Sequence, residues 1–109
     1  MKILAGITLI AAVMLSGCES QEVKQAKEAV ANQLRDPESA QFRNMTETRK
    51  TSLLEHGVVT VCGEVNGKNA YGGYVGFQRF VSRPSVGVVY MENTWSTFDS
   101  VWSRHCSES

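Results

Sequence analysis

The chain has 109 residues, of which 11 are Lys or Arg and 11 are Asp or Glu, so its formal net charge is zero. This length allows one small domain, and the balanced charge excludes a basic surface for neutralising nucleic-acid phosphates. Hydrophobic residues make up 42% and charged residues 20% of the chain, as in folded rather than disordered proteins. We expect one globular domain without a nucleic-acid partner.

The amino-terminal segment has the pattern of an export signal. A basic start, Met1-Lys2, precedes the apolar run Ile3–Met14, which carries no charge. The run is shorter than the ~20 apolar residues that a membrane-spanning helix needs, and polar residues 19–22 end it abruptly. A secretory signal peptide over residues 1–17 is therefore expected.

Leu15-Ser16-Gly17-Cys18 follows the apolar run directly and resembles the lipobox of bacterial lipoproteins. The resemblance implies cleavage before Cys18, a diacylglycerol on its sulfur and an acylated new amino terminus. Two or three acyl chains would hold the protein at a membrane, with residues 18–20 as tether and residues 21–109 as the domain. Glu19 rather than Asp follows the cysteine, which favours the outer membrane, facing the periplasm, in a Gram-negative source. An ordinary signal peptide with a chance cysteine is the alternative.

The domain begins with a predicted helix over Gln21–Arg35, a stretch without Gly or Pro. Its apolar residues recur at spacings of three and four, which indicates an amphipathic helix. Asp36-Pro37-Glu38 ends this helix and predicts a one-turn helix over Pro37–Ala40, with Asp36 as its N-cap.

The middle of the chain is rich in β signals. Val58–Val65 gives the strongest one, because its valines alternate with Thr60, Cys62 and Glu64. Asn66-Gly67 is a strong turn signal. The other expected elements are strands over Phe42–Lys50, Tyr74–Arg83 and Ser85–Met91, with a turn or hairpin loop over Thr51–Gly57.

A final helix is expected to run to about Arg104, with Ser96 and Asp99 as a capping box. Because the strands lie between two helices in the chain, the expected fold class is α+β. We expect a small antiparallel sheet of three to four strands, with the N-terminal and C-terminal helices packed on one face.

Cys62 and Cys106 form an even pair once Cys18 carries lipid, which predicts a disulfide in an exported protein. Trp95, Phe98, Trp102 and Cys106 recur at helical spacing, so one helix face would bring the thiol to the sheet. Closing a loop of about forty residues would contribute roughly 3 to 4 kcal/mol. The alternative is a metal site of His56, Cys62, His105 and Cys106, which lacks the usual ligand spacing.

The segment from Cys62 to Phe80 combines glycines with aromatic residues but contains no phosphate-binding glycine motif. Its glycines either make room for rings across the sheet or mark a bulge. The functional alternative is a binding surface of Tyr71, Tyr74, Phe77 and Arg79, residue types that carry binding energy at interfaces. We expect Tyr74 to lie in the core and Tyr71 to be exposed.

Three segments carry a second resemblance: Asp36–Arg43, Cys62–Asn66 and Asn69–Tyr74. Together they resemble a recurrent family of small exported proteobacterial proteins for which no activity is established. The resemblance therefore implies an exported domain and no particular chemistry.

No catalytic constellation is visible, because His56 and His105 stand in no nucleophile motif and no spacing pairs two carboxylates. We expect a lipid-anchored binding or structural module of the cell envelope, without enzyme activity, cofactor or metal. An envelope protein, peptidoglycan or a phage receptor would be its partner. The alternative is a prophage-type superinfection-exclusion lipoprotein or a small envelope inhibitor of a lytic enzyme, and an enzyme is the third hypothesis.

Overall fold

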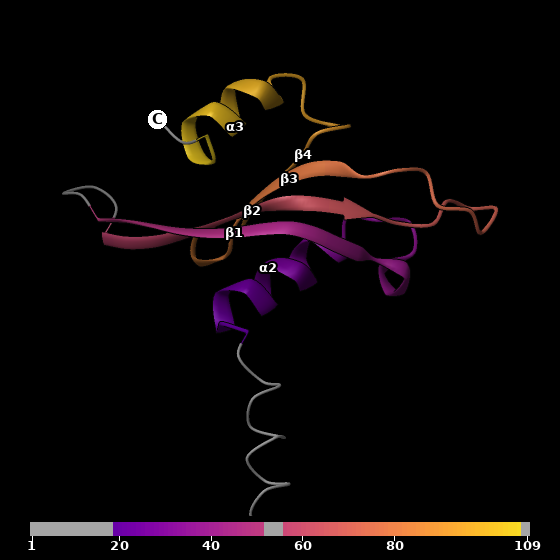
Figure 1. Cartoon of the computed structure of the whole chain (residues 1–109), viewed down its shortest axis with the longest axis horizontal. Coiled ribbons are helices and arrows are strands. Elements are labelled where there is room, and N and C mark those ends of the chain that lie inside the picture. The colour runs from indigo at the N-terminus through magenta and orange to yellow at the C-terminus, as the bar shows by residue number, and fades with distance from the viewer. Residues whose placement is uncertain (1–18, 52–55, 108–109) are drawn as a thin grey trace, which may run out of the picture.

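A computed structural model describes residues 19–51 and 56–107 and shows the expected α+β fold with a four-stranded antiparallel sheet (Figure 1). The signal peptide and the lipobox, including Cys18, lie outside the described residues. In chain order the elements are α2 (Gln21–Ala31), the 3-10 helix η1 (Pro37–Ser39), β1 (Gln41–Thr51), β2 (His56–Asn66), β3 (Gln78–Arg83), the 3-10 helix η2 (Pro84–Val86), β4 (Val88–Met91) and α3 (Phe98–His105).

The strands follow each other across the sheet in the order β1-β2-β3-β4, and every neighbouring pair is antiparallel. Arg43 pairs with Glu64 and Thr46 with Cys62, so β1 carries a bulge between Arg43 and Thr46. Asn44 lies within it and has a φ of 55°. At the bulge the pairing register between β1 and β2 changes by one residue. On both sides of the bulge, paired residues of the two strands lie on the same face of the sheet.

One face of the sheet packs against α2 and forms the main core. Ala26 and Val30 of α2 are 0% exposed and contact the valines of β2. The Phe80 ring, also 0% exposed, meets Phe42 edge to face with ring centroids 5.9 Å apart. The buried residues of this cluster are Ala26, Val30, Val59, Val61, Val65, Phe80 and Met91. The apolar side of β2 that the sequence predicts is therefore the side that α2 covers.

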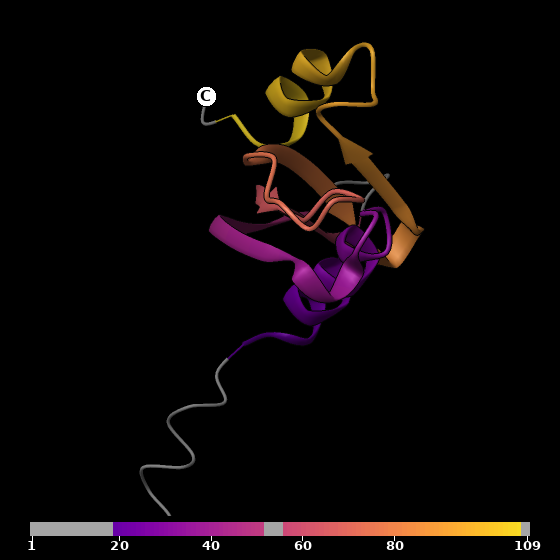
Figure 2. The ribbon, with the colours of Figure 1, turned by 90° about the vertical axis from the view of Figure 1, so that its right-hand side faces the viewer.

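The expectation that both helices pack on one face is wrong: α2 and α3 lie on opposite faces of the sheet (Figures 1 and 2). Alternation along β2 sends Val61 towards α2 and Cys62 to the other side. The disulfide between Cys62 and Cys106 then holds α3 on that second face, with the two Cα atoms 6.0 Å apart. Phe98 of α3 is 4% exposed there.

Three predicted elements differ most from the structure. The other bounds shift by one or two residues, so that the ends of the predicted Thr51–Gly57 loop belong to β1 and β2. The first helix ends at Ala31 rather than Arg35, because Gln33 and Leu34 donate to the carbonyls of Val30 and Ala31 in tighter turns. The third strand begins at Gln78 rather than Tyr74. The fourth covers only Val88–Met91, since residues 84–86 form η2 and Gly87 then takes a left-handed conformation with φ 69°.

The predicted capping box of Ser96 and Asp99 is wrong. Thr97 occupies the N-cap position of α3 and makes no side-chain capping bond. The Asp99 carboxylate instead accepts a hydrogen bond of 2.7 Å from Nη2 of Arg79 on β3. Asp99 therefore forms an ion pair with Arg79 of β3 instead of capping α3.

Among the described helices, none has the length and apolar character needed to cross a membrane.

Candidate functional site

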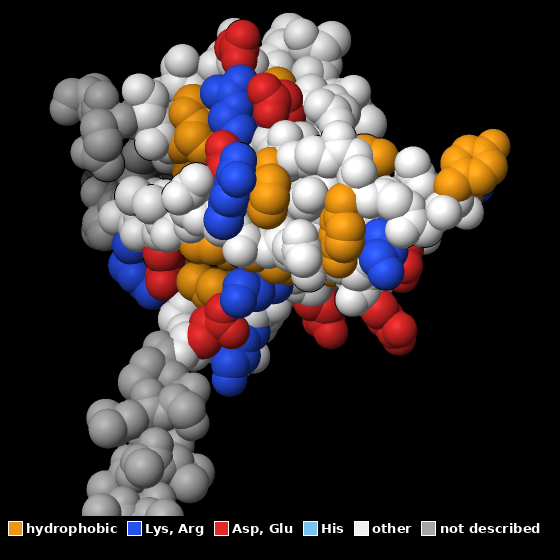
Figure 3. Space-filling model, turned by 45° about the vertical axis from the view of Figure 1, so that its right-hand side comes forward, with side chains coloured by type: hydrophobic (Ala, Val, Ile, Leu, Met, Phe, Trp, Pro, Cys, Tyr) orange, Lys and Arg blue, Asp and Glu red, His pale blue; other side chains and the backbone are white. Residues whose placement is uncertain are grey.

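The connection between β2 and β3, residues 67–77, is the most prominent surface feature, and we call it the tyrosine loop. It extends beyond the end of the sheet (Figure 1). In the space-filling view a hydrophobic group stands out from the body on this side (Figure 3). Tyr71 is 95%, Val75 64% and Tyr74 45% exposed, so the loop supplies three of the five large hydrophobic side chains exposed in the described residues. Such a cluster of exposed apolar groups is typical of a contact surface.

Two asparagine side chains hold the tyrosine loop in one shape. Oδ1 of Asn69 accepts hydrogen bonds from the backbone N–H groups of Tyr71 and Gly73, at 2.9 and 3.1 Å. Oδ1 of Asn66 accepts one from the N–H of Gly76, at 3.0 Å. Gly72 and Gly76 have φ values of 84° and 110°, which side chains other than glycine rarely adopt. The loop is therefore internally bonded rather than a loose connection.

The 3-10 helix η1 anchors the base of the tyrosine loop. Oγ of Ser39 accepts from the N–H of Lys68 at 2.8 Å, and the Tyr74 hydroxyl donates to the Ser39 carbonyl at 3.0 Å. Gly67 lies against Leu34, since a Cβ on it would come 3.0 Å from Leu34 Cδ1. The Asp36–Arg43 and Asn69–Tyr74 segments, which carry the second resemblance, thus meet in space.

The structure confirms the prediction for Tyr71 and contradicts the prediction for Tyr74. Tyr71 is exposed at the loop, as predicted. The expectation that Tyr74 lies in the core is wrong, because β3 begins only at Gln78 and Tyr74 belongs to the loop, where it pairs with Lys68 in an isolated bridge. Tyr74 instead lies half-exposed on the loop, with its ring 5.6 Å from the Lys68 ammonium.

Phe77, at the end of the tyrosine loop, and Arg79 contact other residues than the two tyrosines do. The Arg43 guanidinium stacks on the Phe77 ring at 3.7 Å, and Arg43 also pairs with Glu64. Arg43 and then Asn44, by hydrogen bonding, lower the pKa of the Glu64 carboxyl below its usual value. This cluster belongs to the β1 and β2 side of the sheet.

Arg79 connects three elements within the fold. Its guanidinium bonds Glu92 at 2.9 Å and Asp99 at 2.7 Å, and it lies 5.0 Å from the Trp102 ring. The Glu92 carboxylate also accepts from the Arg79 backbone N–H at 2.8 Å. These hydrogen bonds raise the pKa of Arg79 and lower that of Glu92. The guanidinium of Arg79, which was predicted to bind a partner, is therefore already engaged in contacts with α3.

A pocket of about 230 Å³ lies beside the tyrosine loop, where the loop meets the chain after α2. Leu34 and Val75 supply apolar wall, and Arg35 and Lys68 supply positive charge. The sequence analysis did not select these residues or Ser39, Asn66 and Asn69. Asn69 before Gly72-Gly73 was the available signal, because asparagine side chains often bond the backbone of the following turn.

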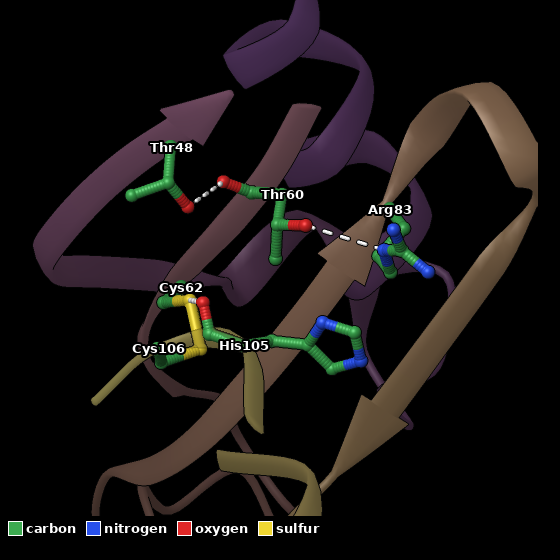
Figure 4. Close-up of a disulfide and its surroundings, with 6 residues drawn as sticks. All are labelled: Thr48, Thr60, Cys62, Arg83, His105 and Cys106. Atoms are coloured by element: carbon green, nitrogen blue, oxygen red, sulfur yellow. Dashed lines mark hydrogen bonds between the residues drawn. A yellow bond between two sulfur atoms is a disulfide. The ribbon is translucent and has the colours of Figure 1, made fainter. Parts of the chain in front are cut away.

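The second face of the sheet carries the disulfide, which contains two of the four residues of the alternative metal site. The Cys62–Cys106 bond lies next to Thr60, whose Oγ1 accepts from Nε of Arg83 at 3.2 Å (Figure 4). Both sulfur atoms are consumed by the disulfide, so neither is a thiolate ligand. No group of three or more His, Cys, Asp or Glu suited to a metal ion occurs in residues 19–51 and 56–107.

Comparisons of the chain with models of protein families, with curated proteins and with solved structures gave no match.

Proposed function

We propose that this protein is a lipid-anchored binding module of the cell envelope, and that it contacts its partner through the tyrosine loop. The observation that carries the proposal is Tyr71, a large aromatic side chain 95% exposed on a loop with its own hydrogen-bond network. In this proposal the protein acts by binding, without catalysis, cofactor, metal or nucleic acid.

Two properties of the tyrosine loop support a binding role. Tyrosine is among the residue types that most often dominate the energy of protein interfaces. A loop already fixed by Asn66 and Asn69 loses little conformational entropy when it binds, so more of the contact energy appears as affinity.

In this proposal the lipid anchor keeps the domain, and with it the tyrosine loop, near the membrane. Oγ of Ser20 accepts from the N–H of Val23 and caps α2, so only Glu19 separates the folded domain from Cys18. A lipid on Cys18 would therefore hold the domain close to the bilayer, with outer-membrane delivery facing the periplasm favoured in a Gram-negative source.

The anchor is tested in cells by metabolic palmitate labelling and by globomycin, which blocks cleavage of lipoprotein signals. We expect label on the native protein, none on Cys18→Ser, and an enlarged precursor with globomycin. Label that persists on Cys18→Ser would contradict the anchor assignment.

The binding surface is tested by in-cell crosslinking and capture with Tyr71→Ala and with Val86→Ala as the matched control. Val86 is also exposed, at 50%, but belongs to η2 rather than to the tyrosine loop. Both variants should unfold within about 0.5 kcal/mol of the native protein, because surface substitutions seldom change stability more. Loss of the captured partner in Tyr71→Ala alone supports the proposal, and equal capture by all three proteins refutes it.

A second candidate is occlusion of a partner's cleft, as in an exclusion lipoprotein or an inhibitor of a lytic enzyme. The projecting loop favours it, because long loops with exposed aromatic residues can insert into concave sites. Phage challenge and a lysis assay on cells that express native protein or Tyr71→Ala test this candidate. Protection that requires Tyr71 supports it, and identical sensitivity of both strains contradicts it.

A further inference from the structure

We propose that the pocket between the tyrosine loop and residues 33–35 is a subsite for the carboxylate of a Glu side chain that the partner presents there. The inference rests on the proposed function, since it names the chemistry of the partner at the same loop. It is carried by the positively charged and amide side chains among the residues that line this pocket.

Two positively charged side chains of the pocket wall have no carboxylate partner within the described residues. Arg35 and Lys68 both belong to the wall, and neither forms a salt bridge within the described residues. The situation differs for Arg43, Arg49 and Arg79, each of which has a Glu partner. Positive charge left unpaired around a concavity favours an anionic ligand.

In two amide side chains of the wall, Asn69 and Gln78, the oxygen atom already accepts hydrogen bonds within the fold. Oδ1 of Asn69 is used by the N–H groups of Tyr71 and Gly73. Oε1 of Gln78, likewise, accepts from the N–H of Asn93 at 3.0 Å. Each amide therefore has its NH₂ group left as a donor, and donors select a ligand that accepts hydrogen bonds. Cations and amide donors together match the oxygen atoms of a carboxylate.

The volume of the pocket and its apolar lining residues restrict the kind of ligand further. The volume of about 230 Å³ lies below the ~300–1,000 Å³ of sites for drug-sized ligands, so the pocket admits one side chain rather than a large cofactor. Leu34 and Val75 offer apolar surface to the aliphatic stem of a Glu side chain. Inorganic phosphate has no such stem.

The test uses the full-length protein in dodecyl maltoside, with backbone amide shifts followed by NMR during titration. The probe is acetyl-Ala-Glu-Ala-amide, and its neutral match is acetyl-Ala-Gln-Ala-amide. We expect saturable shifts at Gly67, Lys68 and Gly76 with the Glu peptide and affinity about tenfold lower with the Gln peptide. Equal affinities of the two peptides, no saturable shift, or phosphate binding as tightly as the Glu peptide would each overturn the carboxylate assignment.

Variants that each remove one positive charge test whether the Glu peptide binds in this pocket. Arg35→Gln and Lys68→Gln should each weaken the Glu peptide about tenfold, whereas Lys24→Gln, which removes an exposed charge from α2 outside the pocket, should not. Thermal unfolding checks that each variant is folded, and Lys68→Met, which keeps an unbranched side chain without the charge, gives a second route should Lys68→Gln not fold. Equal weakening by Lys24→Gln would overturn the subsite.

The two proposals fail separately. If partner capture requires Tyr71 but is unchanged in Arg35→Gln and Lys68→Gln, the subsite is wrong and the binding module stands. If the Glu peptide binds as expected but capture does not require Tyr71, the pocket stands and the assigned function is wrong.

Discussion

Removal of the Cys62–Cys106 disulfide should lower the free energy of unfolding by about 4 kcal/mol. The two cysteines are 44 residues apart in the chain, and linking them removes ~13 cal/mol/K of entropy from the unfolded state, or ~4 kcal/mol near room temperature. For a domain of this size each kcal/mol changes Tm by ~4–8 °C, so Tm should fall by roughly 15–30 °C. Apart from the backbone, the disulfide is the only covalent link among the described residues between α3 and the sheet.

The assay is heat unfolding of the full-length protein in detergent, followed by circular dichroism. Cys62→Ala, Cys106→Ala and the double variant should melt together, because either single change already opens the bond. The double variant serves as control, since it leaves no thiol at either site for pairing between molecules. A double variant that melts within about 5 °C of the native protein would refute the entropic argument.

Three other comparisons, each between two proteins, test the core and the Arg79–Glu92 ion pair. Phe80→Ala should cost ~3–5 kcal/mol in urea unfolding, because Phe80 is 0% exposed, whereas Phe77→Ala, on a half-buried ring, should cost ~1 kcal/mol. Equal losses would contradict this core assignment. Gly63→Ala should cost ~1–3 kcal/mol, since its Cβ would meet Met45 Sδ at 2.7 Å, while Gly73→Ala, with its nearest neighbour at 4.0 Å, should change stability by less than ~0.5 kcal/mol. A neutral Gly63→Ala would show that the sheet has room there. Glu92 has a folded pKa below its ordinary 4.5, so its ionised form stabilises the protein above that pH and the gain is lost as pH falls through the folded value. The stability difference between native protein and Glu92→Gln should therefore shrink on acidification below pH 4.5, and a difference independent of pH would contradict the Arg79–Glu92 pairing.

Local patterns were sufficient for much of this fold. Alternation in Val58–Val65 identified the buried side of β2, and the same alternation placed Cys62 on the opposite side. The helix that bonds to Cys62 therefore had to lie on the face away from the valines. The expectation of one covered face overlooked this consequence, although both observations were in the sequence.

The tyrosine loop could not be derived in the same way. Its shape depends on Asn66 bonding Gly76 and on Ser39 bonding Lys68, which are contacts between residues distant in the chain. Strand propensity alone assigned Tyr74 to the core, and these long-range bonds overrode that propensity. Likewise, Arg79 has the residue type of an interface anchor, but only the fold shows that Glu92 and Asp99 already bind it.

The most direct test of the binding proposal is site-specific photo-crosslinking in living cells. A photoreactive phenylalanine analogue is placed at position 71 in one strain and at position 86, the exposed control in η2, in another. We expect one crosslinked partner from position 71 and none from position 86. The same product from both positions, or no product from position 71 in cells that show lipidated protein at the membrane, would contradict the role of the tyrosine loop.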